Sequence, residues 1–178
     1  MGAWTTYALG SENADLPAFV AIPDPRGLPQ AAGNNWGSGF LPAAFQCTSL
    51  HTPHRIRYLQ TPQAIGKATD DATAAFLKRQ NERHLEKFPG DSQLAARIAS
   101  YELAARMQLS APRLFDVSDE TPATTKSYGL DQAVTADFGR RCLLARRMLE
   151  RGVRFVQVWS GPGGPSNNWD NHNNIDKE

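Results

Sequence analysis

The chain has 178 residues, with 19 basic and 18 acidic side chains. This length allows one domain with a substantial hydrophobic core. The near balance of charge argues against a nucleic-acid partner held through its phosphates. No apolar run approaches the roughly 18 residues that a membrane span requires, and the amino terminus lacks the basic and apolar segments of an export signal.

Residues 1–69 are expected to be irregular with short strands. The apolar run 16–22 precedes a cluster of turn-forming residues at 23–27, which predicts a strand that ends in a turn. A proline interrupts the apolar run 40–45 and argues against an inner strand there. Residues 55–59 alternate polar and apolar side chains, as in a half-exposed strand.

Residues 70–130 are expected to form a helical insert. A first helix, capped by Asp70 or Asp71, should end at the Pro-Gly pair that follows it. A second helix, capped by Asp91, should end before Pro112. Its apolar positions recur at helical spacing and predict one buried face: Leu94, Ile98, Tyr101, Ala105 and Leu109.

Residues 131–178 are expected to form a helix, a strand and a loop. At about 100° per residue, the apolar positions of this third helix fall within a narrow arc: Val134, Phe138, Cys142, Ala145 and Leu149. Gly152 is well placed to end the helix, and an apolar strand begins at Val153. A helix that leads directly into such a strand is half of a βαβ crossover, which predicts an α/β fold with a mostly parallel sheet.

Six arginines lie between Arg140 and Arg154. Arg140, Arg147 and Arg151 lie opposite the apolar arc of the third helix. Guanidinium groups suit bidentate binding of phosphate or sulfate. On a helix with one apolar face, however, such a row is more often the solvated side, which is the interpretation we favour.

The two cysteines, Cys47 and Cys142, indicate little about function. Cys142 lies on the apolar arc, where a buried and unreactive thiol is common. Cys47 has no basic or histidine neighbour that would mark it as a nucleophile. The sequence leaves open whether the two form a disulfide.

The segment Trp169-Asp170-Asn171-His172 follows the last strand through a glycine-rich stretch. Carboxylate and neutral imidazole are good ligands for zinc and other divalent ions. Sites in open α/β sheets lie at the carboxyl ends of strands. Asp170 and His172 are therefore the candidate metal ligands, with Trp169 as an apolar anchor, and a solvated polar loop is the alternative.

Several blocks of the chain together resemble one family. They are Met1–Trp4, 7–20 (YALGSENADLPAFV), 39–46 (GFLPAAFQ), 95–108, 142–157 and 168–172 (NWDNH). The family is a group of exported bacterial proteins, domain of unknown function 1501, often described as sulfatase-like and placed in the alkaline phosphatase superfamily. Cys47 stands where the family usually has glycine.

This resemblance implies a partial alkaline-phosphatase-like fold, with helices on a mostly parallel sheet and a long irregular amino-terminal segment. It implies that Asp170 and His172 bind a divalent metal ion such as zinc, calcium or manganese, with Asn168 or Asn171 as supporting partners. Relatives carry an export signal upstream and further ligands downstream. The chain would thus be one partial domain, 1–178, of an exported protein and inactive alone, and no nucleophile can be assigned to any of its residues.

The resemblance favours a metal-dependent hydrolase of sulfate or phosphate esters, acting on a small-molecule or polysaccharide ester. The metal would polarise the ester oxygens and activate the attacking oxygen. The alternative is a non-catalytic, envelope-associated binding or structural protein that keeps the hydrolase-like fold. Neither the substrate nor the oligomeric state follows from the sequence.

Overall fold

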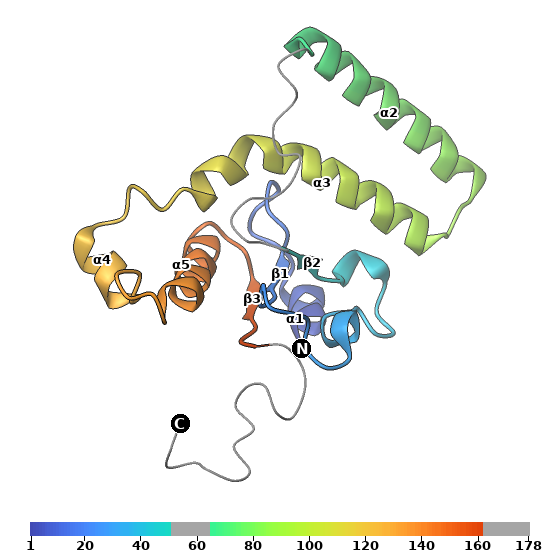
Figure 1. Ribbon diagram of the computed structural model, residues 1–178. Helices are drawn as coiled ribbons and strands as arrows, with labels where there is room; N and C mark the ends of the chain where they lie inside the picture. Colours follow the sequence, from blue (N-terminus) through green and yellow to red (C-terminus); the bar gives the residue numbers. More distant parts are fainter. Residues whose placement is uncertain (51–64, 162–178) are drawn as a thin grey trace.

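The computed structural model describes residues 1–50 and 65–161. Within them, five α-helices accompany a small parallel sheet of three strands, which confirms the predicted mixed α/β class (Figure 1). The helices are α1 (Gly2–Leu9), α2 (Lys67–Lys87), α3 (Ser92–Phe115), α4 (Pro122–Ser127) and α5 (Ala136–Glu150), and the strands are β1 (Phe19–Ile22), β2 (Thr48–Ser49) and β3 (Phe155–Val158). No described helix is long and apolar enough to cross a membrane.

The three strands lie in the order β2-β1-β3, and both pairs are parallel. Val20 of β1 lies between Thr48 and Val156 in the register. All four residues of β1 are buried, as is typical of a central strand covered on both faces. The predicted strands at 16–22 and after Val153 are thereby confirmed, whereas the predicted strand at 55–59 lies outside the described residues.

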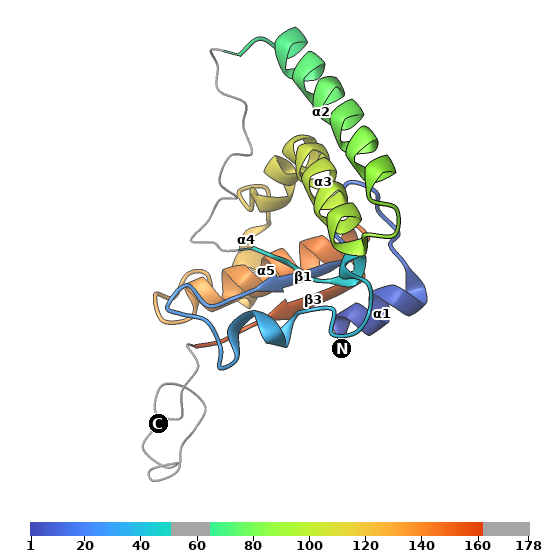
Figure 2. The ribbon, with the colours of Figure 1, turned by 90° about the vertical axis from the view of Figure 1, so that its right-hand side faces the viewer.

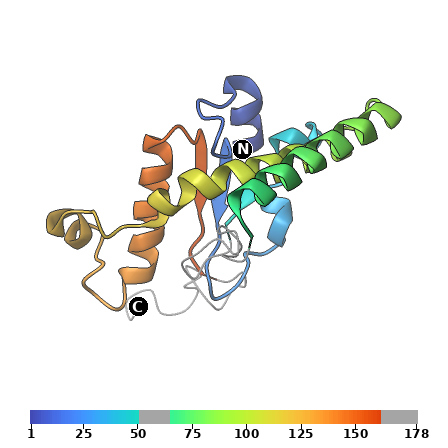
Figure 3. The same ribbon diagram turned by 90° about the horizontal axis from the view of Figure 1, so that it is seen from above.

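The two faces of β1 enter different parts of the core. Val20 and Ile22 pack in a cluster with residues of α3 and α5, including Met107, Leu114 and Met148. Phe19 and Ala21 face the other way, toward Trp36 and the rings of Phe155 and Trp159. Figure 3 shows α5 running beside β3 while α3 crosses over the sheet. The central strand β1 is thus enclosed between helices on one face and aromatic side chains on the other.

Helix α1 falls in the segment expected to be irregular. Its buried face consists of Gly2, Ala3 and Thr6, whose small side chains let the helix approach the sheet closely. The helix ends at Gly10, which has a left-handed φ of 67°. In Figure 2, α1 lies at the end of the sheet where β1 and β3 begin, and the chain leaves β3 at the opposite end.

The helical insert is confirmed in outline and corrected in detail. Helix α2 begins at Lys67 with Gly66 as its N-cap residue, so Asp70 lies in the first turn and neither Asp70 nor Asp71 is the N-cap. The predicted cap of α3 is correct, because Oδ1 of Asp91 accepts from the amides of Gln93 and Leu94 at 3.0 and 2.9 Å. The prediction that Pro112 ends this helix is wrong, since α3 continues to Phe115.

The predicted buried faces of α3 and α5 are confirmed at Ile98 and Ala145, which are buried, and are otherwise shifted. Tyr101 is 69% exposed, and Ala96, Met107 and Leu114 are among the α3 residues that are buried. In α5, Val134 lies outside the helix and is 95% exposed, and Leu149 is 52% exposed. The buried side of α5 shares Ala145 with the predicted arc but is centred elsewhere and includes two arginines: Gly139, Arg141, Leu143, Leu144, Ala145, Arg147 and Met148.

Candidate functional site

The predicted ligands Asp170 and His172 lie outside the described residues, as do Asn168, Trp169 and Asn171. The structure follows the chain to Gly161, three residues beyond the end of β3. At that point the chain lies at the carboxyl edge of the sheet, beside the end of β1. The structure therefore shows where the chain leaves the sheet, upstream of the candidate metal ligands.

A buried carboxylate, Asp24, organises this edge. It follows β1 after one proline, and its side chain is fully buried. Oδ2 of Asp24 accepts the backbone N–H of Gly161 at 2.7 Å and a guanidinium N–H of Arg141 at 3.2 Å. Oδ1 accepts the backbone and side-chain N–H groups of Arg26, both at 2.9 Å. We call Asp24, Arg26, Arg141 and the Gly161 amide the Asp24 cluster.

Arg141 ties the Asp24 cluster to α5 and to the end of β3. Its side chain is only 6% exposed, and it donates to the backbone carbonyl of Trp159. It also forms an ion pair with Asp137, one helical turn earlier, at 2.9 Å. Residues 159 and 161 are therefore each held by one hydrogen bond to the cluster, which fixes where the chain leaves the sheet.

The electrostatics of Asp24 follow from these contacts. The hydrogen bond from the Arg26 side chain holds the pKa of Asp24 well below its usual range. Burial acts in the opposite direction, whereas the Gly161 and Arg26 amides and the charge of Arg141 lower the pKa further. Asp24 is thus a carboxylate at neutral pH, with both oxygens occupied by N–H donors, and it does not fit the role of a metal ligand.

The described residues do not form a metal site by themselves. No group of three or more His, Cys, Asp or Glu side chains that could hold an ion occurs among them. Carboxylate and imidazole remain suitable donors for a divalent ion, and the chain carries such a pair at Asp170 and His172. A metal bound at this edge would therefore depend on that pair.

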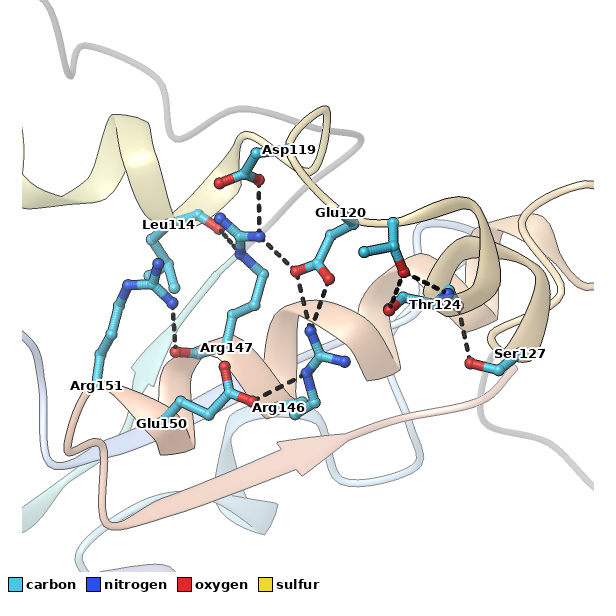
Figure 4. Close-up of polar contacts among 10 residues, drawn as sticks. Leu114, Asp119, Glu120, Thr124, Ser127, Arg146, Arg147, Glu150 and Arg151 are labelled. Carbon is cyan, nitrogen blue, oxygen red and sulfur yellow. Dashed lines mark hydrogen bonds and ion pairs between the residues drawn. The ribbon is translucent and has the colours of Figure 1, made fainter.

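The prediction that the arginine row of α5 is solvated is wrong for Arg147, and Arg141 is also buried. Arg147 is 3% exposed, and its guanidinium donates to the Leu114 carbonyl at 3.1 Å and to Asp119 at 3.0 Å. It also binds Glu120, which receives two further hydrogen bonds from Arg146, each 2.9 Å long (Figure 4).

These four residues, Asp119, Glu120, Arg146 and Arg147, form the Glu120 cluster. They join α5 to the segment between α3 and α4. Both arginine side chains hydrogen-bond to Glu120 and lower its pKa. Because carboxylates already bind these guanidinium groups, the cluster is not arranged to bind a free sulfate or phosphate.

The cysteines have no role in a reactive site. Cys47 and Cys142 are both free, so the disulfide left open by the sequence is absent from this structure of the described residues. Burial raises the pKa of Cys47 to about 12 and also raises the pKa of Cys142. Both groups are therefore protonated thiols at neutral pH, and the thiol form is a poor nucleophile.

Sequence reasoning missed Asp24 as an organising residue. Its position was a usable signal, because a carboxylate directly after a strand predicted to be buried lies at the carboxyl edge of a parallel sheet. The partners of Asp24 carried no such signal. Arg141 and Gly161 are 117 and 137 residues away along the chain.

The sequence matches the family described as "Protein of unknown function (DUF1501)" over residues 1–178. No curated protein and no solved structure matches the chain.

Proposed function

The chain belongs to the DUF1501 family, and from this premise we propose that it contributes a metal-binding loop to a hydrolase of sulfate or phosphate esters. The proposal includes a place for the family in the sulfatase-like part of the alkaline phosphatase superfamily, and export from the bacterial cytoplasm. It rests on the sequence resemblance and on one feature of the fold: the chain leaves β3 at the carboxyl edge of a parallel sheet, and Asp170 and His172 follow in the sequence.

That edge supports the proposal for a physical reason. Parallel strands end side by side, so residues that follow β1 and β3 can converge on one ligand. Asp170 is the ninth residue after Gly161, whose amide is anchored on Asp24. The Asp24 cluster thus restricts the starting point of the loop and reduces the entropy lost when its side chains bind an ion.

In this proposal, Asp170 and His172 are metal ligands and Asn168 or Asn171 supports them through hydrogen bonds. A bound divalent ion, for which zinc, calcium and manganese are candidates, would polarise the ester oxygens. Arg141 and Asp24 contact neither the ion nor the ester. Their part is to hold the backbone at Trp159 and Gly161.

The test is metal binding by the protein. We expect stoichiometric uptake of zinc or manganese by isothermal titration calorimetry, and its loss in the Asp170→Ala/His172→Ala double variant. The matched control is His84→Ala/Glu86→Ala, which removes an imidazole and an acid that are two residues apart in sequence and both exposed on α2. Uptake that persists when Asp170 and His172 are both replaced contradicts the proposal.

Turnover is a separate measurement. The metal-loaded protein is expected to hydrolyse an aryl sulfate or an aryl phosphate, and the Asp170→Ala/His172→Ala variant is not. Specific metal binding without hydrolysis of either ester would instead support a non-catalytic binding protein that keeps the same site.

A further inference from the structure

Helix α1 and the turn at Phe40 expose a continuous group of aromatic side chains. The Trp4 ring meets the Tyr7 ring edge-to-face, with 5.9 Å between centroids, and meets the Phe40 ring in the same way at 5.1 Å. Tyr7 in turn meets the ring of Phe45 at 5.3 Å. We call this surface the Trp4 face, and it consists of Trp4, Tyr7, Phe40 and Phe45.

The fold holds the Trp4 face in a fixed position. A Cβ atom at Gly2 would lie 2.5 Å from the ring of Phe19, so α1 packs directly on the start of β1 while its aromatic side chains stay exposed. Phe40 projects from a turn in which the next residue, Leu41, is buried. The edge-to-face contacts restrict the rings further, so little conformational entropy is left to lose when a partner binds.

The exposed area of the Trp4 face approaches what a protein interface requires. Trp4, Tyr7 and Phe40 are 48%, 56% and 85% exposed. Because an aromatic side chain offers about 150–250 Å² of surface, these three together expose about 300–450 Å². Apolar patches of this size often mark an interaction site. A standard interface buries about 800 Å² per partner, of which somewhat more than half is apolar. The Trp4 face thus supplies most of the apolar area that one partner needs.

The chemistry of the Trp4 face favours a protein surface of the same kind over a lipid surface or a small ligand. Helices that bind lipid surfaces carry lysine or arginine on their polar side, and α1 has no charged side chain. Ligand sites are concave and hold a few polar groups, whereas Phe40 projects into solvent. Interface cores are rich in aromatic residues and poor in charged ones. Two copies of this neutral face can therefore meet without removing a charged side chain from water.

We propose that the Trp4 face is a docking surface for a second copy of this chain, which forms a twofold dimer through α1 and the Phe40 turn. Such an interface uses the same patch on both copies. Its modest area predicts association that is weak and depends on protein concentration. In Figure 2, α1 lies at the end of the sheet opposite to the point where the chain leaves β3. The interface is therefore separate from the edge that we propose to bind metal.

Phe40→Arg tests the dimer, since it adds a charge at the most exposed position of the Trp4 face. In sedimentation equilibrium over a concentration series of the protein, Phe40→Arg should lower the association constant at least about ten-fold. Phe76→Arg is the matched control, because it makes the same change at a half-exposed phenylalanine of α2, which lies on the other side of α3 from α1 (Figure 1). Association of the control should equal that of the natural chain. A natural chain that is monomeric at all concentrations, or equal association constants of the two variants, would overturn the proposal.

Two further measurements distinguish a second copy from other occupants. The thermal midpoint of dilute Phe40→Arg should stay within about 2 °C of the natural value, because Phe40 is mostly exposed in the monomer. A lower midpoint with unchanged sedimentation would mean that the same chain covers the Trp4 face, and would overturn the proposal. The natural chain should also fail to float with phosphatidylcholine vesicles. Flotation that Phe40→Arg abolishes would identify a lipid surface as the occupant and would equally overturn it.

Discussion

Two buried arginines, Arg141 and Arg147, determine how α5 is attached to the rest of the molecule. Each guanidinium is less than a tenth exposed and has carboxylate partners, Asp24 for the first and Glu120 for the second. Burial of a charge is costly unless a partner and hydrogen bonds offset it. Both arginines also donate to backbone carbonyls, of Trp159 and Leu114, so each fixes a second segment in place.

Arg147→Ala should therefore be strongly destabilising. The change leaves the Leu114 carbonyl without this donor and Glu120 with Arg146 as its remaining arginine partner in the cluster. We expect a loss of about 3 kcal/mol in the free energy of unfolding, measured by urea denaturation. Arg151→Ala, an exposed arginine one turn away, should change it by less than about 0.5 kcal/mol. Equal effects of the two variants would contradict the burial argument.

The arginines also show what a sequence pattern leaves out. Helical periodicity classifies Arg147 as polar and so assigns it to the solvated side. Its burial depends on Glu120, 27 residues away, and that of Arg141 depends on Asp24, 117 residues away. Nothing in the local sequence indicates these pairs. Ala145 is the one residue of the predicted α5 arc that is buried, and the rest of that arc was wrong for the same reason, because it assumed that every buried position is apolar.

At the scale of elements, the position of α4 and its flanking loop depends on a close contact with α5. A Cβ atom at Gly139 would lie 1.8 Å from the carbonyl oxygen of Tyr128. The segment at Tyr128 therefore packs directly on the α5 backbone. The cation–π contact between Arg146 and the Tyr128 ring, with 5.5 Å from Cζ to the centroid, lies beside it.

Gly139→Ala should consequently destabilise the protein even though alanine favours helices. The added methyl group requires the Tyr128 backbone to move, which should cost about 2 kcal/mol in the free energy of unfolding. Gly33→Ala is the control, since nothing lies within 4 Å of the added atom there. The thermal midpoint of Gly33→Ala should match that of the natural chain. A Gly139→Ala variant that is more stable than the natural chain would mean that the close contact between Gly139 and the Tyr128 carbonyl is absent.

Elements with explicit end signals could be predicted from the sequence. Gly152, with φ of 90°, ends the last turn before β3, and Asp91 caps α3, both as expected. Helix α4 has an equally clear signal that was overlooked: Thr121 accepts from the Thr124 amide at 3.1 Å, and proline follows it. Helix α1 has no charged residue and no apolar period, so its helicity reflects packing on the sheet.

At the scale of the whole molecule, Asp24 joins three distant parts of the chain. It lies after β1, binds Arg141 of α5, and accepts the Gly161 amide beyond β3. The carboxyl edge of the sheet was predictable from the strand pattern, and the Asp24 cluster was not. The assignment of Asp170 and His172 as metal ligands stays a prediction, because those residues lie outside the described part of the chain.

The role of Asp24 predicts how the stability of the fold depends on pH. Because the pKa of Asp24 is lower in the folded chain than the ordinary value of about 4, its contribution to stability is complete above that value and is lost as the pH falls below it. The pKa of Glu120 is also lowered, so protonation of Glu120 contributes to the same loss of stability at low pH. The thermal midpoint should therefore fall between about pH 5 and pH 2.

Asp24→Asn should separate the two contributions. The variant keeps an acceptor for the Gly161 amide but loses the charge that Arg26 and Arg141 bind. Its thermal midpoint, followed by circular dichroism, should be lower than that of the natural chain at pH 7 and should fall less between pH 7 and pH 2, so that the two curves converge in acid. The remaining fall in the thermal midpoint of the variant comes from protonation of Glu120 and other carboxylates. Parallel curves would mean that the charge of Asp24 does not hold the carboxyl edge of the sheet together.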